Sequence, residues 1–242
     1  MPPAFDIVEA MSTDLRVNLE SVRNRIIESA GRVGREADEI KLVAVSKTHP
    51  ASVVNEAIDA GVTVFGENKV QEADDKISAV GRDRAEWHLI GHLQSNKARR
   101  AVQLFDVIHS INSPDLAKRL ERICVEEDRS SLSVFVQVDL AREETKSGIP
   151  ENELPSLVSY LRSCSRLSFD GLMLLPPYFE NPEEARPFFK RLRGIRDDLA
   201  LQGAFAGGRG ELSMGMSHDF EIAIEEGATV VRVGTAIFGA RS

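Results

Sequence analysis

The chain has 242 residues, of which 42% are hydrophobic and 28% charged, and its formal net charge is −8. It carries no basic arm or basic face, which argues against nucleic acid as a partner, and no apolar run is long enough to span a membrane. No positive segment followed by an apolar one opens the chain, so no secretory signal is predicted, and the two cysteines, Cys124 and Cys164, are expected to be free thiols. We therefore expect a cytoplasmic protein.

The N-terminal segment predicts a helix over residues 6–30, because Leu15, Leu19, Val22 and Ile26 recur at helical spacing. From residue 41 onward, apolar strand-like runs alternate with amphipathic helical ones. The predicted strands are 41–46, 62–66, 87–91, 106–110, 133–140, 169–175, 211–215 and 229–234. The predicted helices between them are 51–61, 68–80, 95–104, 113–127, 151–164, 182–200 and 217–227, and none is predicted after the last strand.

This alternation predicts the fold class. Repeated β–α units force the strands to run parallel, and eight of them can close into a barrel of about 250 residues. An open doubly wound sheet is the alternative, but residues 46–52, SKTHPAS, stand where its glycine-rich turn would follow the first strand. We predict an α/β protein, a single (β/α)8 TIM barrel with an extra N-terminal helix. One domain is expected over residues 1–242, with the helix and a loop in 1–39 and the barrel in 40–242.

Chemistry in such barrels gathers where the strands end. The residues expected there, in chain order, are Lys47, Asn68, His92, His109, Asn112, Lys146, Arg232, Gly234 and Thr235. Asn68 also fits a helix cap that is paired with Gln71. A metal site is not predicted, because His88 and His92 lie four apart in a strand without clustered carboxylates.

Two features near the C-terminus favour a bound ligand. Ser213 and Ser217 flank a glycine-containing turn that leads into a helix, and Gly234 and Thr235 follow the last strand. Barrels commonly build phosphate sites from backbone N–H groups at this place. Ser217, His218 and Asp219 do not make a hydrolase triad, because consecutive residues cannot converge on one atom; Ser217 is otherwise a helix N-cap.

Arg232 lies within the apolar run VVRVG, so in a barrel strand it is expected to point inward to a partner. An amine at Lys47, a phosphate site across the barrel mouth and an inward arginine together match pyridoxal 5′-phosphate (PLP). Lys47 would form a Schiff base with the aldehyde. Arg232 would face the pyridine nitrogen and keep it unprotonated, which weakens the electron sink of the ring.

The motifs AVSKTHP, FGENKVQE, WHLIGHLQSNK, ETKSGI, ELSMGMSHDF and VRVGTAIFG occur in this order from about residue 40 to the C-terminus. They resemble the PLP homeostasis protein family, also called the YggS/PROSC family, which has the barrel fold of the N-terminal domain of alanine racemase. The resemblance implies reversible PLP binding and a role in intracellular vitamin B6 homeostasis as a carrier or regulator, without robust catalysis. Possible partners are PLP-dependent apo-enzymes, and a monomer is expected.

Carried over by position, the resemblance makes Lys47 the Schiff-base lysine and places Asn68 beside the cofactor. Ser213, Ser217, Gly234 and Thr235 would surround the phosphate. Lys146 would be a second PLP contact or a transfer station. No catalytic residue is predicted.

The alternative function is a PLP-dependent amino-acid racemase of the alanine racemase type. Such an enzyme needs a second base on the opposite face of the cofactor. In alanine racemase a tyrosine from a second domain takes that part, and this chain reaches only seven residues beyond Thr235. Tyr178, on a predicted strand-end loop, is the one candidate substitute. A phosphate-sugar enzyme is a third class, but it would not explain a lysine combined with an arginine.

Overall fold

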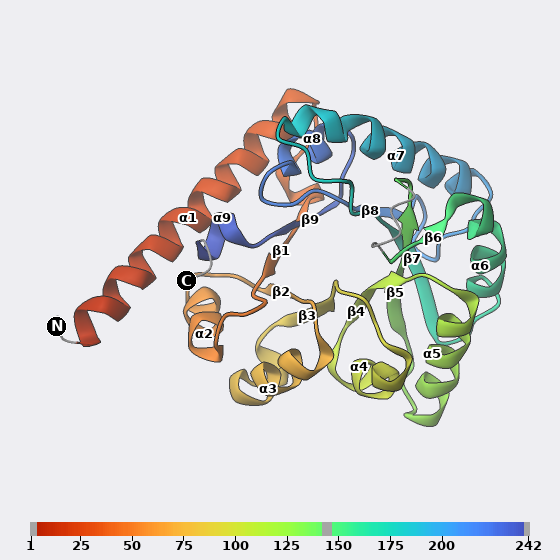
Figure 1. The fold of residues 1–242 in the computed structure, drawn as a ribbon, viewed down its shortest axis with the longest axis horizontal. Helices are drawn as coiled ribbons and strands as arrows, with labels where there is room; N and C mark the ends of the chain where they lie inside the picture. Colours follow the sequence, from red (N-terminus) through yellow and green to blue (C-terminus); the bar gives the residue numbers. More distant parts are fainter. Residues whose placement is uncertain (1–3, 142–146, 240–242) are drawn as a thin grey trace.

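A computed structural model describes residues 4–141 and 147–239. Its strands are β1 (Lys41–Val45), β2 (Val64–Glu67), β3 (Glu86–Leu89), β4 (Val107–Ile111), β5 (Leu132–Asp139), β6 (Ile149–Pro150), β7 (Leu167–Met173), β8 (Glu211–Ser213) and β9 (Val230–Val233). All nine pair in parallel: eight follow the order β4-β3-β2-β1-β9-β8-β7-β5, a β4–β5 pairing closes the ring, and β6 pairs with the end of β5. The predicted eight-stranded barrel is therefore confirmed (Figure 1).

Helices surround the barrel. They are α1 (Ala4–Arg32), α2 (Ala51–Asp59), α3 (Val70–Val80), α4 (Ala98–Leu104), α5 (Pro114–Glu126), α6 (Leu154–Leu161), α7 (Arg186–Leu201), α8 (Phe220–Glu225) and α9 (Thr235–Phe238). Short 3-10 turns occur at Ala37–Glu39, Arg82–Arg84, Ser95–Lys97, Glu151–Glu153 and Pro182–Ala185. No helix in the described residues is long and apolar enough to cross a membrane.

The N-terminal helix covers the barrel where the last two helices are short. The predicted face of α1, formed by Leu15, Leu19, Val22 and Ile26, is buried, and α1 packs against α8 and α9. Figure 1 shows α1 running past α9 and outward from the barrel. Arg25 forms a two-pronged ion pair with Glu221, 196 residues later in the chain.

Several local features differ from the sequence-based expectations. The last strand is followed by a helix after all, the four-residue α9. The two-residue strand β6, which pairs with the end of β5, was not predicted. The sequence predicts that Pro187 kinks or delays the helix over 182–200; the segment begins as a 3-10 turn, and α7 starts at Arg186 with Pro187 in its first turn. Proline is tolerated there because the first helical N–H groups have no partner within the helix.

The interior of the barrel is small and contains both apolar and polar side chains. Its apolar cluster consists of Val43, Val64, Val107, Phe135, Met173 and Val230, whereas a much larger core lies between the strands and the helices. Because successive side chains of a strand point to opposite faces, His88 of β3 points inward between two outward neighbours, Trp87 and Leu89. Arg232 of β9 likewise points inward, between Val231 and Val233.

Candidate functional site

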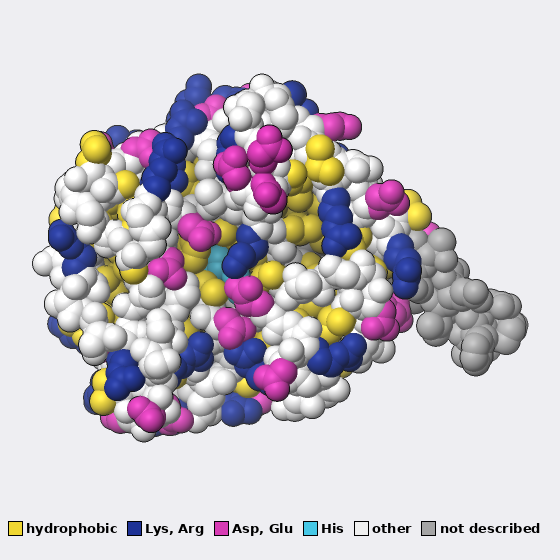
Figure 2. Space-filling model, turned by 180° about the vertical axis from the view of Figure 1, so that it is seen from behind, with side chains coloured by type: hydrophobic (Ala, Val, Ile, Leu, Met, Phe, Trp, Pro, Cys, Tyr) yellow, Lys and Arg dark blue, Asp and Glu magenta, His cyan; other side chains and the backbone are white. Residues whose placement is uncertain are grey.

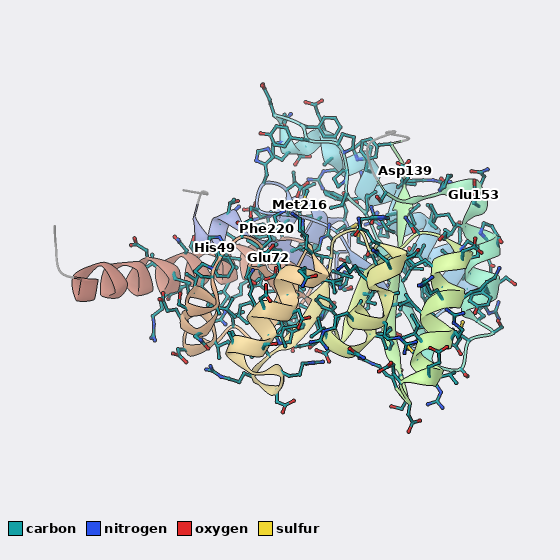
Figure 3. All side chains as sticks on the ribbon, turned by 60° about the horizontal axis from the view of Figure 1, so that its bottom comes forward. His49, Glu72, Asp139, Glu153, Met216 and Phe220 are labelled. Atoms are coloured by element: carbon teal, nitrogen blue, oxygen red, sulfur yellow. The ribbon has the colours of Figure 1, made fainter. Side chains whose placement is uncertain are left out.

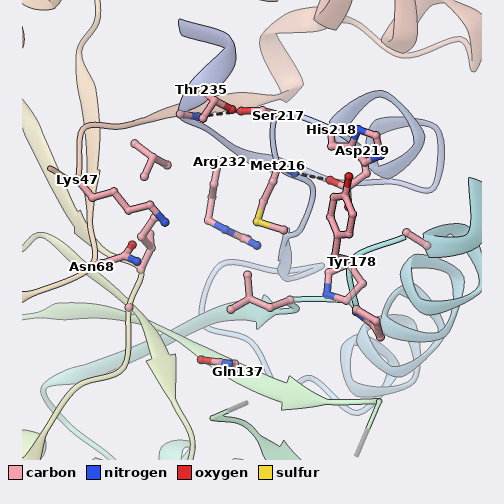
Figure 4. A pocket seen from close by; sticks show the side chains of 18 of the residues that line it. Lys47, Asn68, Gln137, Tyr178, Met216, Ser217, His218, Asp219, Arg232 and Thr235 are labelled. Carbon is pink, nitrogen blue, oxygen red and sulfur yellow. Dashed lines mark hydrogen bonds between the residues drawn. The ribbon is translucent and has the colours of Figure 1, made fainter. Parts of the chain in front are cut away.

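A cavity of about 630 Å³ opens where the strands end. The residues that line it include Val45, Lys47, Asn68, Ile90, Gly91, His92, Gln137, Ser147, Leu175, Tyr178, Met216, Ser217, His218, Asp219, Arg232, Gly234 and Thr235. Figure 4 shows Lys47 entering it beside Asn68, with Arg232 at the centre and Thr235 and Ser217 on one side. Six of the seven residues that the sequence predicted as cofactor-binding therefore share one cavity.

The seventh, Ser213, does not line the cavity. Its side chain is fully buried, and its hydroxyl lies 2.6 Å from Nη1 of Arg232 and 2.8 Å from Nδ1 of His109. The alternative roles considered for Asn68 and Ser217 are not found either, because the residues that cap α3 and α8 are Lys69 and Asp219. Lys146 lies outside the described residues.

Lys47 is the second residue after β1, and both of its chain neighbours are held by α3. Nζ of Lys76 donates to the carbonyl of Ser46 at 2.6 Å, and the backbone N–H of Thr48 donates to Glu72. Thr48 has a φ of 69°, a left-handed conformation that is uncommon outside glycine. Figure 3 shows Glu72 near His49, the next residue along the chain. The backbone that carries Lys47 is thus fixed from both sides.

A buried ion pair supports this arrangement. Lys76 donates to Oε1 of Glu67 at 2.7 Å and to Glu72 at 2.8 Å, and the Ser46 hydroxyl donates to Glu67 at 2.6 Å. Glu67 is fully buried, and Lys76 is 6% exposed. Burial raises the pKa of Glu67 while Lys76 opposes the shift. Oε2 of Glu67 has no hydrogen-bond partner among the described residues.

The backbone at the end of β2 is fixed by a close approach. A Cβ on Gly91 would lie 2.2 Å from the carbonyl oxygen of Asn68. Only glycine allows the chain after β3 to pass so near. This contact places Asn68 at the edge of the cavity.

The opposite side of the cavity is built from the turns after β8 and β9. The Ser217 hydroxyl accepts hydrogen bonds from the backbone N–H groups of Gly234, at 3.2 Å, and Ala236, at 3.3 Å. Gly215 has a φ of 92°, and a Cβ there would lie 2.6 Å from Cβ of Ala223. The N–H groups of Gly234 and Ala236 therefore hold the Ser217 oxygen in place, and the hydroxyl groups of Ser217 and Thr235 line one corner of the cavity, where each can donate its hydrogen to an anion.

Arg232 is 3% exposed and sits between these two sides. Its Nη2 donates to the carbonyl of Leu174 at 2.9 Å, in addition to the bond from Nη1 to Ser213. Burial lowers the pKa of Arg232 to about 10, which leaves it charged at pH 7. Two of its five N–H groups are used in these bonds, so others can donate to a ligand in the cavity.

The two histidines considered for a metal site lie in different parts of the barrel. His88 is buried inside the barrel, 2.9 Å from His109, whereas His92 lines the cavity. No cluster of side chains suited to a metal occurs in the described residues. The sequence pattern does not indicate the contact between His88 and His109, although each residue stands at an inward position of a predicted strand.

The rim of the cavity carries an aromatic pair. Tyr178 is 78% exposed and stacks on His218 with 5.5 Å between ring centroids. His218 itself lies 3.2 Å from the carbonyl of Phe179. Gln137 of β5, which the sequence did not indicate, is buried and borders the cavity from below in Figure 4.

Residues 17–242 match the family model for the N-terminal domain of alanine racemase. The chain is 41% identical over 223 residues to the pyridoxal phosphate homeostasis protein of Aquifex aeolicus, covering 92% of this chain and 96% of the relative. It is 44% identical over 235 residues to the protein of that name from Escherichia coli K12, covering 94% and 97%.

Among solved structures, PipY of Synechococcus elongatus with PLP bound is similar, with a TM-score of 0.81 and 39% identity over 93% of this chain and 100% of PipY. Alanine racemase from Corynebacterium glutamicum has a TM-score of 0.66 and 19% identity, covering 97% of this chain and 61% of the racemase. At that identity the likeness concerns the fold alone.

Proposed function

This chain belongs to the alanine racemase N-terminal domain family, among the pyridoxal phosphate homeostasis proteins, and we propose that it binds PLP through Lys47 and serves PLP homeostasis. The observation that carries the proposal is the composition of the cavity. An amine, a buried guanidinium and a corner with two hydroxyl donors face one space. These groups match the aldehyde, the ring nitrogen and the phosphate of PLP, respectively.

Each residue takes one task in this proposal. Lys47 forms the Schiff base, and its fixed backbone presents the amine to the cavity. Ser217, Gly234 and Thr235 hold the phosphate, and Asn68 packs beside Lys47. Ser213 was expected at the phosphate, but its position behind Arg232 favours a role in holding the guanidinium instead.

Arg232 also bears on catalysis. Bound PLP supplies an electron sink, and the sink is strongest when the ring nitrogen is protonated. Arg232 is a donor and remains charged at pH 7, so it disfavours a proton on that nitrogen. We therefore propose a carrier or regulator that passes PLP to dependent apo-enzymes, rather than a racemase.

The phosphate assignment is tested by comparing two ligands. Replacing Thr235 with alanine is expected to weaken PLP about tenfold to a hundredfold, the value of a hydrogen bond to a charged group. Pyridoxal, which lacks the phosphate, should change by less than about twofold by the same reasoning. Ser147→Ala, which removes a hydroxyl elsewhere on the cavity wall, is the control and should affect neither ligand. Equal losses for both ligands would exclude a phosphate contact at Thr235.

The absence of racemase activity is tested in D₂O. PLP-loaded protein incubated with L-alanine is expected to show neither deuteration at Cα nor D-alanine at rates near 1 s⁻¹, roughly the lower end of ordinary enzyme turnover. The measurement is proton NMR together with chiral chromatography. Turnover at that rate that is lost in both Lys47→Ala and Tyr178→Phe would instead identify a racemase with Tyr178 as its second base.

A further inference from the structure

A continuous row of hydrogen bonds crosses the inside of the barrel. It starts at Arg232, whose Nη1 lies 2.6 Å from the Ser213 hydroxyl, and continues 2.8 Å from that hydroxyl to Nδ1 of His109. Nε2 of His109 lies 2.9 Å from Nδ1 of His88, and Nε2 of His88 lies 2.7 Å from Oε1 of Glu86. Glu86 is the first residue of β3, so the row runs from the cavity to the opposite end of the barrel.

The row is shielded from water along its middle. Ser213 and His109 are fully buried, and His88 is 1% exposed. The ring of His109 is stacked on Phe135, with 4.5 Å between centroids and 1° between planes. Glu86 is half-buried and also accepts from Lys41 at 3.0 Å. Figure 2, which looks at the end where the strands begin, shows a histidine at the centre among acidic and basic side chains.

The chemistry of the two ends determines the direction of every bond. Arginine has only donors, and a carboxylate has only acceptors. The Ser213 hydroxyl accepts from Arg232 and therefore donates its hydrogen to Nδ1 of His109. His109 then donates from Nε2 to His88, and His88 donates from Nε2 to Glu86. In this arrangement each donor meets an acceptor, and both imidazoles are neutral with their hydrogen on Nε2.

One added proton would reverse the two central bonds. His88 would then be an imidazolium between Glu86 and His109, and the Ser213 hydroxyl would lose its acceptor on His109. Burial disfavours this state, because it lowers the pKa of His88 and places that of His109 well below its usual value. The bond from His88, helped by Lys41, lowers the pKa of Glu86 to about 2, so the acceptor end stays charged.

Resting on the proposed function, we propose that Ser213, His109 and His88 are positioning residues for Arg232. They connect the guanidinium to the negative charge of Glu86 and hold it in the orientation that presents an N–H to the ring nitrogen of PLP. The row thereby makes recognition of that nitrogen depend on a carboxylate at the far end of the barrel. No carboxylate in the described residues is hydrogen-bonded to Arg232 directly.

Other charged groups also face the two imidazoles. Lys41 of β1 and Asp106, which precedes β4, act on His88 in opposite directions, and Lys41 and Arg232 both disfavour a proton on His109. Among these groups only Glu86 is hydrogen-bonded to an imidazole of the row. A substitution of Glu86 should therefore affect the hydrogen-bond row more selectively than a substitution of Lys41 or Asp106.

The first test measures the protonation of the two histidines of the row in protein without ligand. ¹⁵N NMR of histidine-labelled protein should show His88 and His109 neutral, with hydrogen on Nε2, at pH 7 and still neutral at pH 5.5; single substitutions of each histidine assign the signals. Glu86→Gln, which keeps an acceptor oxygen but removes the charge, should shift the signals of both rings. Glu211→Gln removes an acid at the same end of the barrel outside the row and should shift neither. A doubly protonated His88 at pH 7, or a His109 signal that is indifferent to Glu86→Gln, overturns the proposal.

The second test asks what the row does for the ligand. Ser213→Ala should weaken PLP and pyridoxal by the same factor, roughly tenfold, because both contain the ring nitrogen. The PLP analogue with carbon in place of that nitrogen should bind the variant and the parent within about twofold of each other on the same argument. Ser110→Ala is the matched control, since Ser110 is a buried hydroxyl without a hydrogen-bond partner in the described residues.

The outcomes separate this inference from the proposed function. A loss larger for PLP than for pyridoxal would return Ser213 to the phosphate and overturn the positioning role. An equal loss for the carbon analogue would show a general packing defect and would also overturn it. If the parent protein binds no PLP at all, the proposed function fails, and the NMR measurement still decides whether the row exists.

Discussion

Replacing Lys47 with alanine is expected to abolish the borohydride-stable attachment of PLP and to leave the fold intact. The imine needs an amine in the cavity, and in the proposal Lys47 alone supplies it from the end of β1. The bonds that fix this stretch involve the carbonyl of Ser46 and the N–H of Thr48. Both are backbone groups, so the alanine variant keeps these two bonds.

The measurement is mass spectrometry of protein reduced with borohydride in the presence of PLP, followed by peptide mapping. Lys69→Ala is the control, because Lys69 is an exposed lysine two residues beyond Glu67 and does not line the cavity. The parent and the control should each carry one cofactor on the peptide that contains Lys47. One equivalent retained on Lys47→Ala would refute the assignment, and mapping would then show whether Lys146 is the acceptor.

Replacing Lys76 with methionine is expected to lower the free energy of unfolding by about 3–5 kcal/mol, the usual cost of leaving one partner of a buried ion pair alone. Glu67 is fully buried, and without Lys76 it keeps only the Ser46 hydroxyl as a partner in the described residues. The carbonyl of Ser46 also loses its donor. The same change should slow imine formation at Lys47, since the backbone beside it is released.

Urea unfolding gives the free energy, and the rate of PLP capture gives the second readout. The double variant Lys76→Met/Glu67→Met should recover a large part of the stability, because two apolar side chains replace the pair. Lys118→Met, which breaks an exposed ion pair with Asp115, should cost less than about 1 kcal/mol. If Lys76→Met costs no more than Lys118→Met, the pair does not support the Lys47 segment.

The sequence predicts the barrel well because its pattern repeats. Each strand from 41–46 onward is an apolar run, and each but the last is followed by a predicted helix, so a single rule fixes eight strands and the seven helices between them. Elements that are too short to show a hydrophobic pattern were not predicted. The strand β6 has two residues and α9 has four, which is too short for either period to be visible.

Within the candidate site, the predictable residues are those that stand at strand ends. Lys47, Asn68, Arg232, Gly234 and Thr235 follow from the end positions alone once the barrel is assumed. The position of Ser213 did not follow, because a hydroxyl near a strand end can point into the cavity or below it. Its contact with His109 joins residues 104 apart in the chain, and no single-sequence pattern shows which strands face each other across a barrel.

The pairing of Glu67 with Lys76 illustrates the same limit. The two residues lie on a strand and on the following helix, nine positions apart. A charged residue in an amphipathic helix usually faces solvent, so Lys76 gave no sign of being buried. Only the packing of α3 against the end of β1 turns it inward.

The contact between α1 and the last two helices has a consequence for how the protein is made. Synthesis produces α1 well before its partners Glu221 and Ile237, which lie 196 and 219 residues after the α1 residues that they contact. Until then the apolar stripe of α1 has no surface to cover, and β1 lacks its neighbour β9. A nascent chain on the ribosome therefore carries an exposed helix face and an open sheet edge until α8, β9 and α9 have been made, and both features invite aggregation. The chain thus depends on chaperones until β9 is made or on rapid closure afterwards, and misassembly is expected when synthesis stalls shortly before β9.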